Sequence, residues 1–286
     1  MPGDSVGRPH QRVISMENIS SYGVTDRGTA STEIELHVER IRRVGFTVLD
    51  GGFQAEDVRQ LSDRLDRLLV DQARRAGGID RLVAIGEHET VRCCLAYDDA
   101  FLRLASNPGV LAVCRALMGE YVVLTQQNGI VNAAGREHVQ AAFHRDLPYQ
   151  HFVSSRPVAV SALFCVDAFT CENGATVVLR GTHQMAAFPS PPLVAELAQA
   201  VEAPMGHYLV FDSMLFHRAG SNTSAHPRRA VNHVYGLPFM AQQISLPDQL
   251  GGRHADDPDL RRLLGYDSGP VPSVDAWWQR RRDRRG

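Results

Sequence analysis

The sequence contains no lysine, so all 30 of its basic residues are arginine. It also lacks an apolar run of the roughly 18 residues that a membrane-spanning helix needs, and its amino terminus has no apolar segment typical of a signal peptide. The formal net charge of −2 argues against nucleic acid as the main partner. We therefore expect a cytoplasmic protein that acts on a small molecule, without a nucleic-acid or membrane partner. These features do not indicate an oligomeric state.

Cysteine is scarce and follows no pairing pattern. There are five cysteines, an odd number, and no C-x-x-C pair among them. This favours reduced thiols over a disulfide framework or a zinc site. Cys93 and Cys94 are adjacent, and we interpret them as a buried pair.

The arrangement of apolar residues predicts helices first and strands afterwards. Residues 1–30 are polar and predict a flexible amino-terminal arm. Helices are expected over residues 31–43, 55–78 and 99–118, with a strand over 45–52; Pro108 must break or restart the third helix.

Short β-branched and aromatic runs separated by turn residues follow Tyr121, for example PVAVSALFCVDAF and HYLVFDSMLF. This order predicts an α+β fold with a jelly-roll, cupin-like core and flanking amino-terminal helices. We expect one domain over residues 31–278 and a basic tail over 279–286.

The segment AAFHRDLPYQ (141–150) contains the His-Arg-Asp tripeptide of protein-kinase catalytic loops. A kinase also needs a strand lysine for the nucleotide phosphates and an asparagine five residues after the aspartate. The chain has no lysine, and position 151 is histidine. Kinase chemistry is therefore excluded.

The same tripeptide suits a metal site. In an extended segment His144 and Asp146 project to one face, and His217 follows an apolar strand far downstream. Two histidines and one carboxylate form the facial triad of non-haem Fe(II) oxygenases. Taken alone, the H-x-D spacing is equally consistent with a turn, and His254-Ala255-Asp256 repeats it in a Gly- and Asp-rich loop that no histidine follows.

Arg228 lies eleven residues after His217 and opens a strand. An oxygenase that uses 2-oxoglutarate needs a buried cation for the distal carboxylate, and the planar guanidinium suits that carboxylate. Arg229 is expected to point the other way as a solvated surface arginine, although a register slip of one residue would exchange the two roles.

The order H-x-D, then ENGATVVLRGTH (172–183), then GHYLVFDSMLFH (206–217) with a later arginine resembles the phytanoyl-CoA dioxygenase family of Fe(II)/2-oxoglutarate oxygenases. The resemblance covers residues 40–240. It implies a double-stranded β-helix core, iron ligands at His144, Asp146 and His217, and a 2-oxoglutarate anchor at Arg228. The family often carries Ser or Thr two residues after the distal histidine, where this chain has Ala219; Ser221 or Thr125 would have to substitute.

Polar residues on neighbouring strands are further candidates. Gln126, Asn128 and Asn132 share one face by alternation, which indicates a wet cavity or an exposed sheet face. The resemblance implies that Asn128 and Asn132 contact 2-oxoglutarate. Substrate is expected at a mouth lined by Tyr149, His151, Phe152 and Arg156.

The predicted function is an Fe(II)- and 2-oxoglutarate-dependent dioxygenase that consumes O₂ and releases succinate and CO₂. Hydroxylation of an unactivated C–H bond of a small metabolite, in specialised metabolism, is the default outcome; desaturation, ring closure and epimerisation stay open. One alternative is a non-catalytic jelly roll that binds a small ligand or sugar. Another is a cupin-type isomerase, which would use the histidines as acid and base and would not need Arg228.

Overall fold

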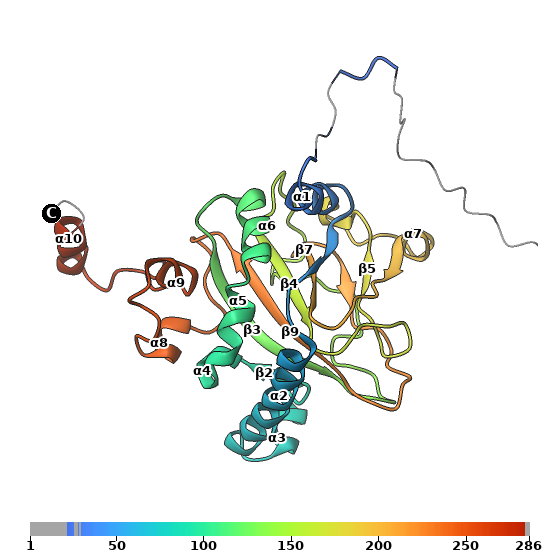
Figure 1. Ribbon diagram of the computed structural model, residues 1–286, viewed down its shortest axis with the longest axis horizontal. Coiled ribbons are helices and arrows are strands. Elements are labelled where there is room, and N and C mark those ends of the chain that lie inside the picture. The colour runs from blue at the N-terminus through green and yellow to red at the C-terminus, as the bar shows by residue number, and fades with distance from the viewer. Residues whose placement is uncertain (1–21, 26–27, 29, 284–286) are drawn as a thin grey trace, which may run out of the picture.

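A six-stranded antiparallel sheet forms the centre of the fold, and a three-stranded sheet faces it (Figure 1). The structure is a computed structural model that describes residues 22–25, 28 and 30–283. The large sheet has the order β1-β7-β4-β9-β3-β2, and the small sheet the order β6-β5-β8. The strands are β1 (Phe46–Asp50), β2 (Thr90–Arg92), β3 (Val123–Asn132), β4 (Ala159–Cys165), β5 (Val177–Leu179), β6 (Ala198–Ala200), β7 (His207–Asp212), β8 (His217–Arg218) and β9 (Arg228–Gly236).

Helices from the first half of the chain cover the outer face of the large sheet, and the last three of the four later helices extend to one side (Figure 1). The first group is α1 (Glu33–Val44), α2 (Ala55–Arg75), α3 (Ile79–Ala84), α4 (Cys94–Tyr97), α5 (Leu102–Ala105) and α6 (Pro108–Met118). The later helices are α7 (Pro191–Leu197), α8 (Leu246–Leu250), α9 (Pro258–Leu263) and α10 (Val274–Asp283), and two 3₁₀ turns occupy Asp99–Phe101 and Thr182–Gln184. The expected α+β jelly roll with flanking amino-terminal helices is confirmed.

Local sequence signals explain where the helices begin. Thr32 and Glu35 form a reciprocal capping box at the start of α1. Asn107 caps α6 through the backbone N–H of Val110, and Pro108 occupies the first turn. Pro108 therefore restarts the helix, as expected.

Alternation along the strands separates the core under the helices from the apolar side chains on the inner face of the large sheet. In β4, Val160 and Phe164 pack under the helices, whereas Leu163 faces the small sheet. In β9, Tyr235 joins the helical side and Ala230 the inner side. The space between the two sheets is therefore a distinct compartment, and it is where the jelly roll can hold a ligand.

Two boundaries differ from the expectation. The strand expected to run into His217 ends at Asp212, and His217 starts β8 in the other sheet. The turn between them lets the chain cross from one sheet to the other. At the carboxyl end, residues 279–283 continue helix α10, so the expected tail begins inside a helix. The expected amino-terminal arm lies largely outside the described residues.

The cysteines are free thiols, and no disulfide joins them. Cys93 and Cys94 are both buried, as expected for an apolar pair. Burial raises the pKa of the Cys94 thiol to about 12, so that thiol stays protonated at neutral pH. No helix within the described ranges is long and apolar enough to cross a membrane.

Candidate active site

The structure brings His144, Asp146 and His217 together between the two sheets. Their ligand atoms all lie within 4.8 Å of one another, and the two imidazole ring centres are 4.5 Å apart. His144 is not part of a regular strand; it forms an isolated antiparallel bridge with His217 of β8. Asp146, two residues further on, points to the same place. Across the described part of the chain, this is the one group of three or more such side chains arranged to hold a metal ion.

Backbone carbonyls orient both imidazoles. Nδ1 of His144 lies 2.9 Å from the carbonyl oxygen of Ala142, and Nδ1 of His217 lies 3.0 Å from that of Leu215. Each Nδ1 therefore carries the proton and donates it, which leaves the Nε2 lone pair free as a metal ligand. Nε2 of His144 is buried without a hydrogen-bond partner among the described residues. A metal ion would satisfy it.

The carboxylate of Asp146 has one oxygen held and one free. Its Oδ2 accepts a short hydrogen bond from Ser161 Oγ and a longer one, 3.3 Å, from Asn232 Nδ2. Its Oδ1 lies 3.5 Å from Nε2 of His217. This arrangement presents a single oxygen to an ion and leaves further coordination positions open.

The protonation states agree with a ligand set. Burial opposes ionisation of Asp146, but the charge of His217 and its hydrogen bond outweigh burial and lower the pKa of the carboxyl. Burial opposes protonation of His217, but Asp146 outweighs it and raises the pKa of that imidazole. Burial, followed by repulsion from His217, lowers the pKa of His144. The ionised carboxylate attracts a cation, and a divalent ion can replace the proton shared with His217.

Arg145, between the two ligands, faces away from them as expected and fixes the surrounding loops. Its guanidinium donates to the backbone carbonyls of Met214 (2.7 Å) and Thr182 (3.1 Å) and also to those of Gln150 and Met185. The same group lies 3.9 Å above the ring of Phe216. Burial lowers the pKa of Arg145. This residue therefore holds the segment that carries His144 and Asp146 in place.

Arg228 lies on the inner face of β9 and lines the same cavity as the triad. Its side chain is buried, Nη2 donates to the carbonyl of Gly174 at 3.1 Å, and the guanidinium sits 4.3 Å above the ring of Phe169. Nε has no hydrogen-bond partner, and within the described chain no carboxylate forms an ion pair with Arg228. Burial lowers its pKa to about 10, so the group is still cationic at neutral pH. A buried, unpaired cation beside a metal triad is suited to an anionic ligand.

Gly174 makes room for the loops beside the Arg228 side chain. Its φ is 79°, and a Cβ there would lie 2.5 Å from the carbonyl oxygen of Gly220 and from Nδ2 of Asn132. A side chain at this position would push apart the loops that close the cavity around Arg228.

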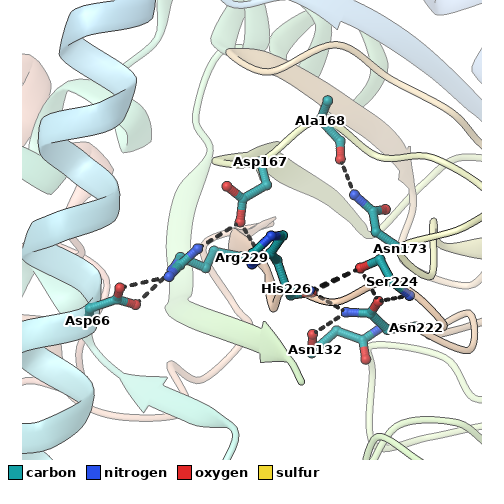
Figure 2. A network of polar contacts seen from close by, with 9 residues as sticks. All are labelled: Asp66, Asn132, Asp167, Ala168, Asn173, Asn222, Ser224, His226 and Arg229. Atoms are coloured by element: carbon teal, nitrogen blue, oxygen red, sulfur yellow. Dashed lines mark hydrogen bonds and ion pairs between the residues drawn. The ribbon is translucent and has the colours of Figure 1, made fainter. Parts of the chain in front are cut away.

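Arg229 points to the opposite side of the sheet, which settles the register (Figure 2). It forms ion pairs with Asp66 of α2 at 2.7 Å and with Asp167 at 3.2 Å (Figure 2). The expectation that it points away from the site is confirmed. It is not a solvated surface arginine, because its side chain is only 19% exposed and ties α2 to the sheet.

A hydroxyl that the sequence reasoning missed lies opposite Ala219. The pairing of β5 with β8 places Val177 opposite Arg218, and the same register continued by one residue places Thr176 opposite Ala219. Both Thr176 and Ala219 line the cavity with Arg228. Ser221 and Thr125, the substitutes expected from the sequence, do not line it: Thr125 Oγ1 donates to Val234 O, and Ser221 is exposed.

The polar face of β3 divides into two parts. Gln126 and Asn128 line a cavity beside the triad. Asn132 is buried further along the strand, and its side-chain Nδ2 donates to the backbone carbonyl of Gly220 at 2.9 Å. The backbone carbonyl of Asn132 accepts from Nδ2 of Asn222 (Figure 2). A cavity lined by polar side chains is therefore present beside Gln126 and Asn128, whereas Asn132 holds two loops together. Contact of Asn128 and Asn132 with a cosubstrate stays a prediction.

The residues expected at the substrate mouth lie on an exposed loop that follows Asp146 in the chain. The side chain of Tyr149 is 73% exposed and that of Phe152 40%, and His151 and Arg156 are also exposed. Their contact with substrate stays a prediction. The cavities beside the triad are lined instead by other polar side chains, namely Gln126, Asn128, Gln140, Asn232 and Gln243.

The second H-x-D copy is not a ligand pair. His254 has a φ of 65°, and its Nε2 lies 3.1 Å from Oδ1 of Asp99. It therefore belongs to a local turn.

Comparisons with known proteins identify the family. The model of the family described as Phytanoyl-CoA dioxygenase (PhyH) matches residues 41–230. An uncharacterised protein of Mycobacterium tuberculosis, Rv1501, is 30% identical over 256 residues, which is 87% of this chain and 93% of that protein. The dioxygenase af480 of Aspergillus fumigatus is 29% identical over 177 residues, covering 58% of this chain and 55% of that enzyme.

Solved structures agree on the fold. EctD from S. alaskensis, solved with 2-oxoglutarate and 5-hydroxyectoine, has a TM-score of 0.59 at 23% identity over 76% of this chain and 79% of its own. The epimerase SnoN, solved with Fe³⁺, α-ketoglutarate and nogalamycin RO, has a TM-score of 0.54 at 21% identity. The match covers 78% of this chain and 92% of the SnoN chain. The family match and the metal triad agree with the expected cofactors, Fe(II) and 2-oxoglutarate. The chain belongs to the phytanoyl-CoA dioxygenase family and is an oxidoreductase of the dioxygenase class.

Proposed function

We propose that the protein hydroxylates an unactivated C–H bond of a small-molecule metabolite, with Fe(II) bound by His144, Asp146 and His217 and 2-oxoglutarate anchored by Arg228. The observation that carries this proposal is that the triad and an unpaired, buried guanidinium line one cavity. A sugar-binding jelly roll has no need of either. An isomerase that uses the histidines as acid and base has no need of Arg228.

Each residue has a defined task in this scheme. The two Nε2 atoms and one carboxylate oxygen would hold the ion, while Ser161 and Asn232 hold the other oxygen of Asp146. Arg228 fixes the end of the cosubstrate that is remote from the metal. Leu163 and Phe211 supply apolar wall to the cavity and reduce access of water to the reacting centre.

Iron and 2-oxoglutarate together would supply the oxidising chemistry: R–H, 2-oxoglutarate and O₂ give R–OH, succinate and CO₂. Asp146 would supply the carboxylate ligand that a halogenase lacks in order to bind halide, which supports hydroxylation over halogenation. A role in specialised metabolism is supported by the likeness in fold to SnoN, which is described as an enzyme of nogalamycin biosynthesis.

The test begins without a substrate. Anaerobic addition of Fe(II) and 2-oxoglutarate to the folded protein is expected to give a weak visible charge-transfer band. Metabolites are then screened by O₂ uptake coupled to succinate release. Under ¹⁸O₂, the hydroxylated product and succinate should each gain one labelled oxygen.

Two results would contradict the proposal. A folded protein that shows no band and binds no 2-oxoglutarate is not this enzyme. A product of unchanged mass would indicate epimerisation, and a product lighter by two hydrogens would indicate desaturation or ring closure. Either result would keep the proposed cofactors and rule out hydroxylation.

A further inference from the structure

A second cavity, of about 170 Å³, adjoins the triad and shares His144, Asp146 and Asn232 with the cavity of Arg228. We propose that this second cavity, here called the amide pocket, binds a neutral, hydroxyl-rich group of the substrate, such as a polyol or sugar ring, and places its C–H bond beside the triad. The inference rests on the proposed function and adds the substrate class to it.

Side-chain amides dominate the walls of the amide pocket. The five are Gln126, Asn128, Gln140, Asn232 and Gln243. Gln126 is half-buried and Gln140 is exposed, and within the described chain neither side-chain amide is engaged by another residue, so both are available to a ligand. An amide offers an acceptor oxygen and two donor hydrogens, and a hydroxyl both donates and accepts, so the two groups are complementary.

Asn232 supplies a buried acceptor that lacks a donor. Its Nδ2 is used by the Asp146 carboxylate, whereas its Oδ1 is buried and has no partner among the described residues. A buried unsatisfied oxygen is unfavourable until a ligand donates to it. A substrate O–H next to the metal would be such a donor, and it would lie close to the carbon that reacts.

The cations around the pocket are already occupied. Arg92 is paired with Glu87 through two contacts, of 2.7 and 2.5 Å. The donors of Arg145 are directed to backbone carbonyls, including that of Met214. An anionic group such as a coenzyme A phosphate therefore finds no free cation here, whereas a neutral group meets no uncompensated charge.

One wall of the pocket is held rigid before ligand arrives. Asn128 Oδ1 accepts from the backbone N–H of Cys93 at 3.2 Å, and its Nδ2 donates to Gln243 Oε1 at 3.1 Å. Gln243 Oε1 also accepts from Arg92 at 3.0 Å. This chain fixes the positions of the amides, which lowers the entropy lost on binding. The pocket therefore discriminates by hydrogen bonding, and a purely aliphatic group would leave its polar atoms unpaired.

A larger outer cavity, of about 550 Å³, continues from the amide pocket past Gln126 and Gln243. Leu147, Val234 and Met240 give its walls a mainly apolar character. A less polar part of the substrate would lie there, while the hydroxylated part lies against the metal. A glycoside with an apolar aglycone has this shape and polarity.

The test uses protein loaded with Ni(II) and 2-oxoglutarate, which binds substrate without turnover, and phenyl β-D-glucoside as the probe. Calorimetry is expected to show binding of the glucoside and weaker binding of decanoyl-CoA. Gln126→Leu should weaken glucoside binding roughly fivefold, because one or two neutral hydrogen bonds are lost, with 2-oxoglutarate binding unchanged. Gln249→Leu, on the exposed side of α8, is the matched control and should bind the glucoside like the parent.

Tighter binding of decanoyl-CoA than of the glucoside would overturn the proposal. So would the failure of the glucoside to bind, or an affinity that Gln126→Leu leaves unchanged. Failure of the proposed function can be told apart from failure of this inference. It would appear before any glucoside is added, because the Ni(II)-loaded protein would not bind 2-oxoglutarate.

Discussion

His144 and His217 exchange both of their backbone hydrogen bonds: the N–H of each donates to the carbonyl of the other, at 2.9 and 3.0 Å. The pairing sets the two imidazoles side by side, although the segments lie far apart in the sequence. Both bonds are made by backbone atoms and do not depend on either side chain. Substitution of a side chain can therefore remove the metal without removing the fold.

Loss of the carboxylate ligand should remove metal without unfolding the protein. Asp146→Ala is expected to weaken Fe(II) binding more than about a hundredfold, since the ion keeps only two protein ligands. Metal content after anaerobic gel filtration measures this, and circular dichroism checks the fold. Asp256→Ala, in the second H-x-D copy, should retain the metal. Equal metal loss in both variants would refute the ligand assignment.

The two adjacent arginines should have opposite phenotypes. Arg228→Ala is expected to raise the 2-oxoglutarate concentration needed for half-saturation on the order of a hundredfold, with near-normal iron content, because a buried charge-assisted contact is lost. Arg229→Ala should leave 2-oxoglutarate binding unchanged and lower the free energy of unfolding by about 1–3 kcal/mol, because its pairs with Asp66 and Asp167 are broken. Anaerobic titration and urea unfolding measure the two effects. An exchange of phenotypes would transfer the anchor to Arg229.

The hydroxyl opposite Ala219 should assist the cosubstrate anchor. Thr176→Val removes the hydroxyl at nearly constant volume and is expected to weaken 2-oxoglutarate binding roughly fivefold. Adding Ala219→Ser restores a hydroxyl from the opposite strand and should recover most of the affinity. A purely structural role for Thr176 would not be rescued in this way, and a double variant as weak as the single one would contradict the prediction.

Buried His233 should make stability sensitive to acid. Burial lowers its pKa from 6.5 to about 4; its Nδ1 donates to Ala162 O, and its Nε2 accepts from Gln127. The unfolded chain takes up a proton below pH 6.5 and the folded protein does not, so the free energy of unfolding should fall as the pH drops from about 6.5 to about 4.

His233→Gln should reduce that fall by up to about 3 kcal/mol, the value that corresponds to a pKa difference of this size. Urea unfolding at several pH values measures it. The exposed His226→Gln variant is the control and should retain the parental slope. An unchanged slope in His233→Gln would show that the acid response arises elsewhere.

Much of the site was predictable because alternation along a strand is a local property. Residues two apart in an extended segment share a face, which predicted that His144 and Asp146 lie together and that Arg228 and Arg229 point to opposite sides, but not which of the two arginines faces the cavity. The restart of the helix at Pro108 was predictable for the same kind of reason, since capping is local. A polar serine in the centre of the apolar run PVAVSALFCV was a signal that Ser161 faces something polar, although not that it holds Asp146.

The sequence by itself determined the residue types of the candidate metal triad, the positive charge at Arg228 and the jelly-roll class, because these depend on residue identity and short-range periodicity. The tertiary structure alone decided that β7 ends before His217, that Thr176 faces Ala219, and that five amides surround one cavity. Those relationships come from register between strands distant in the chain. Register depends on packing summed over both sheets, which no local stretch of sequence contains.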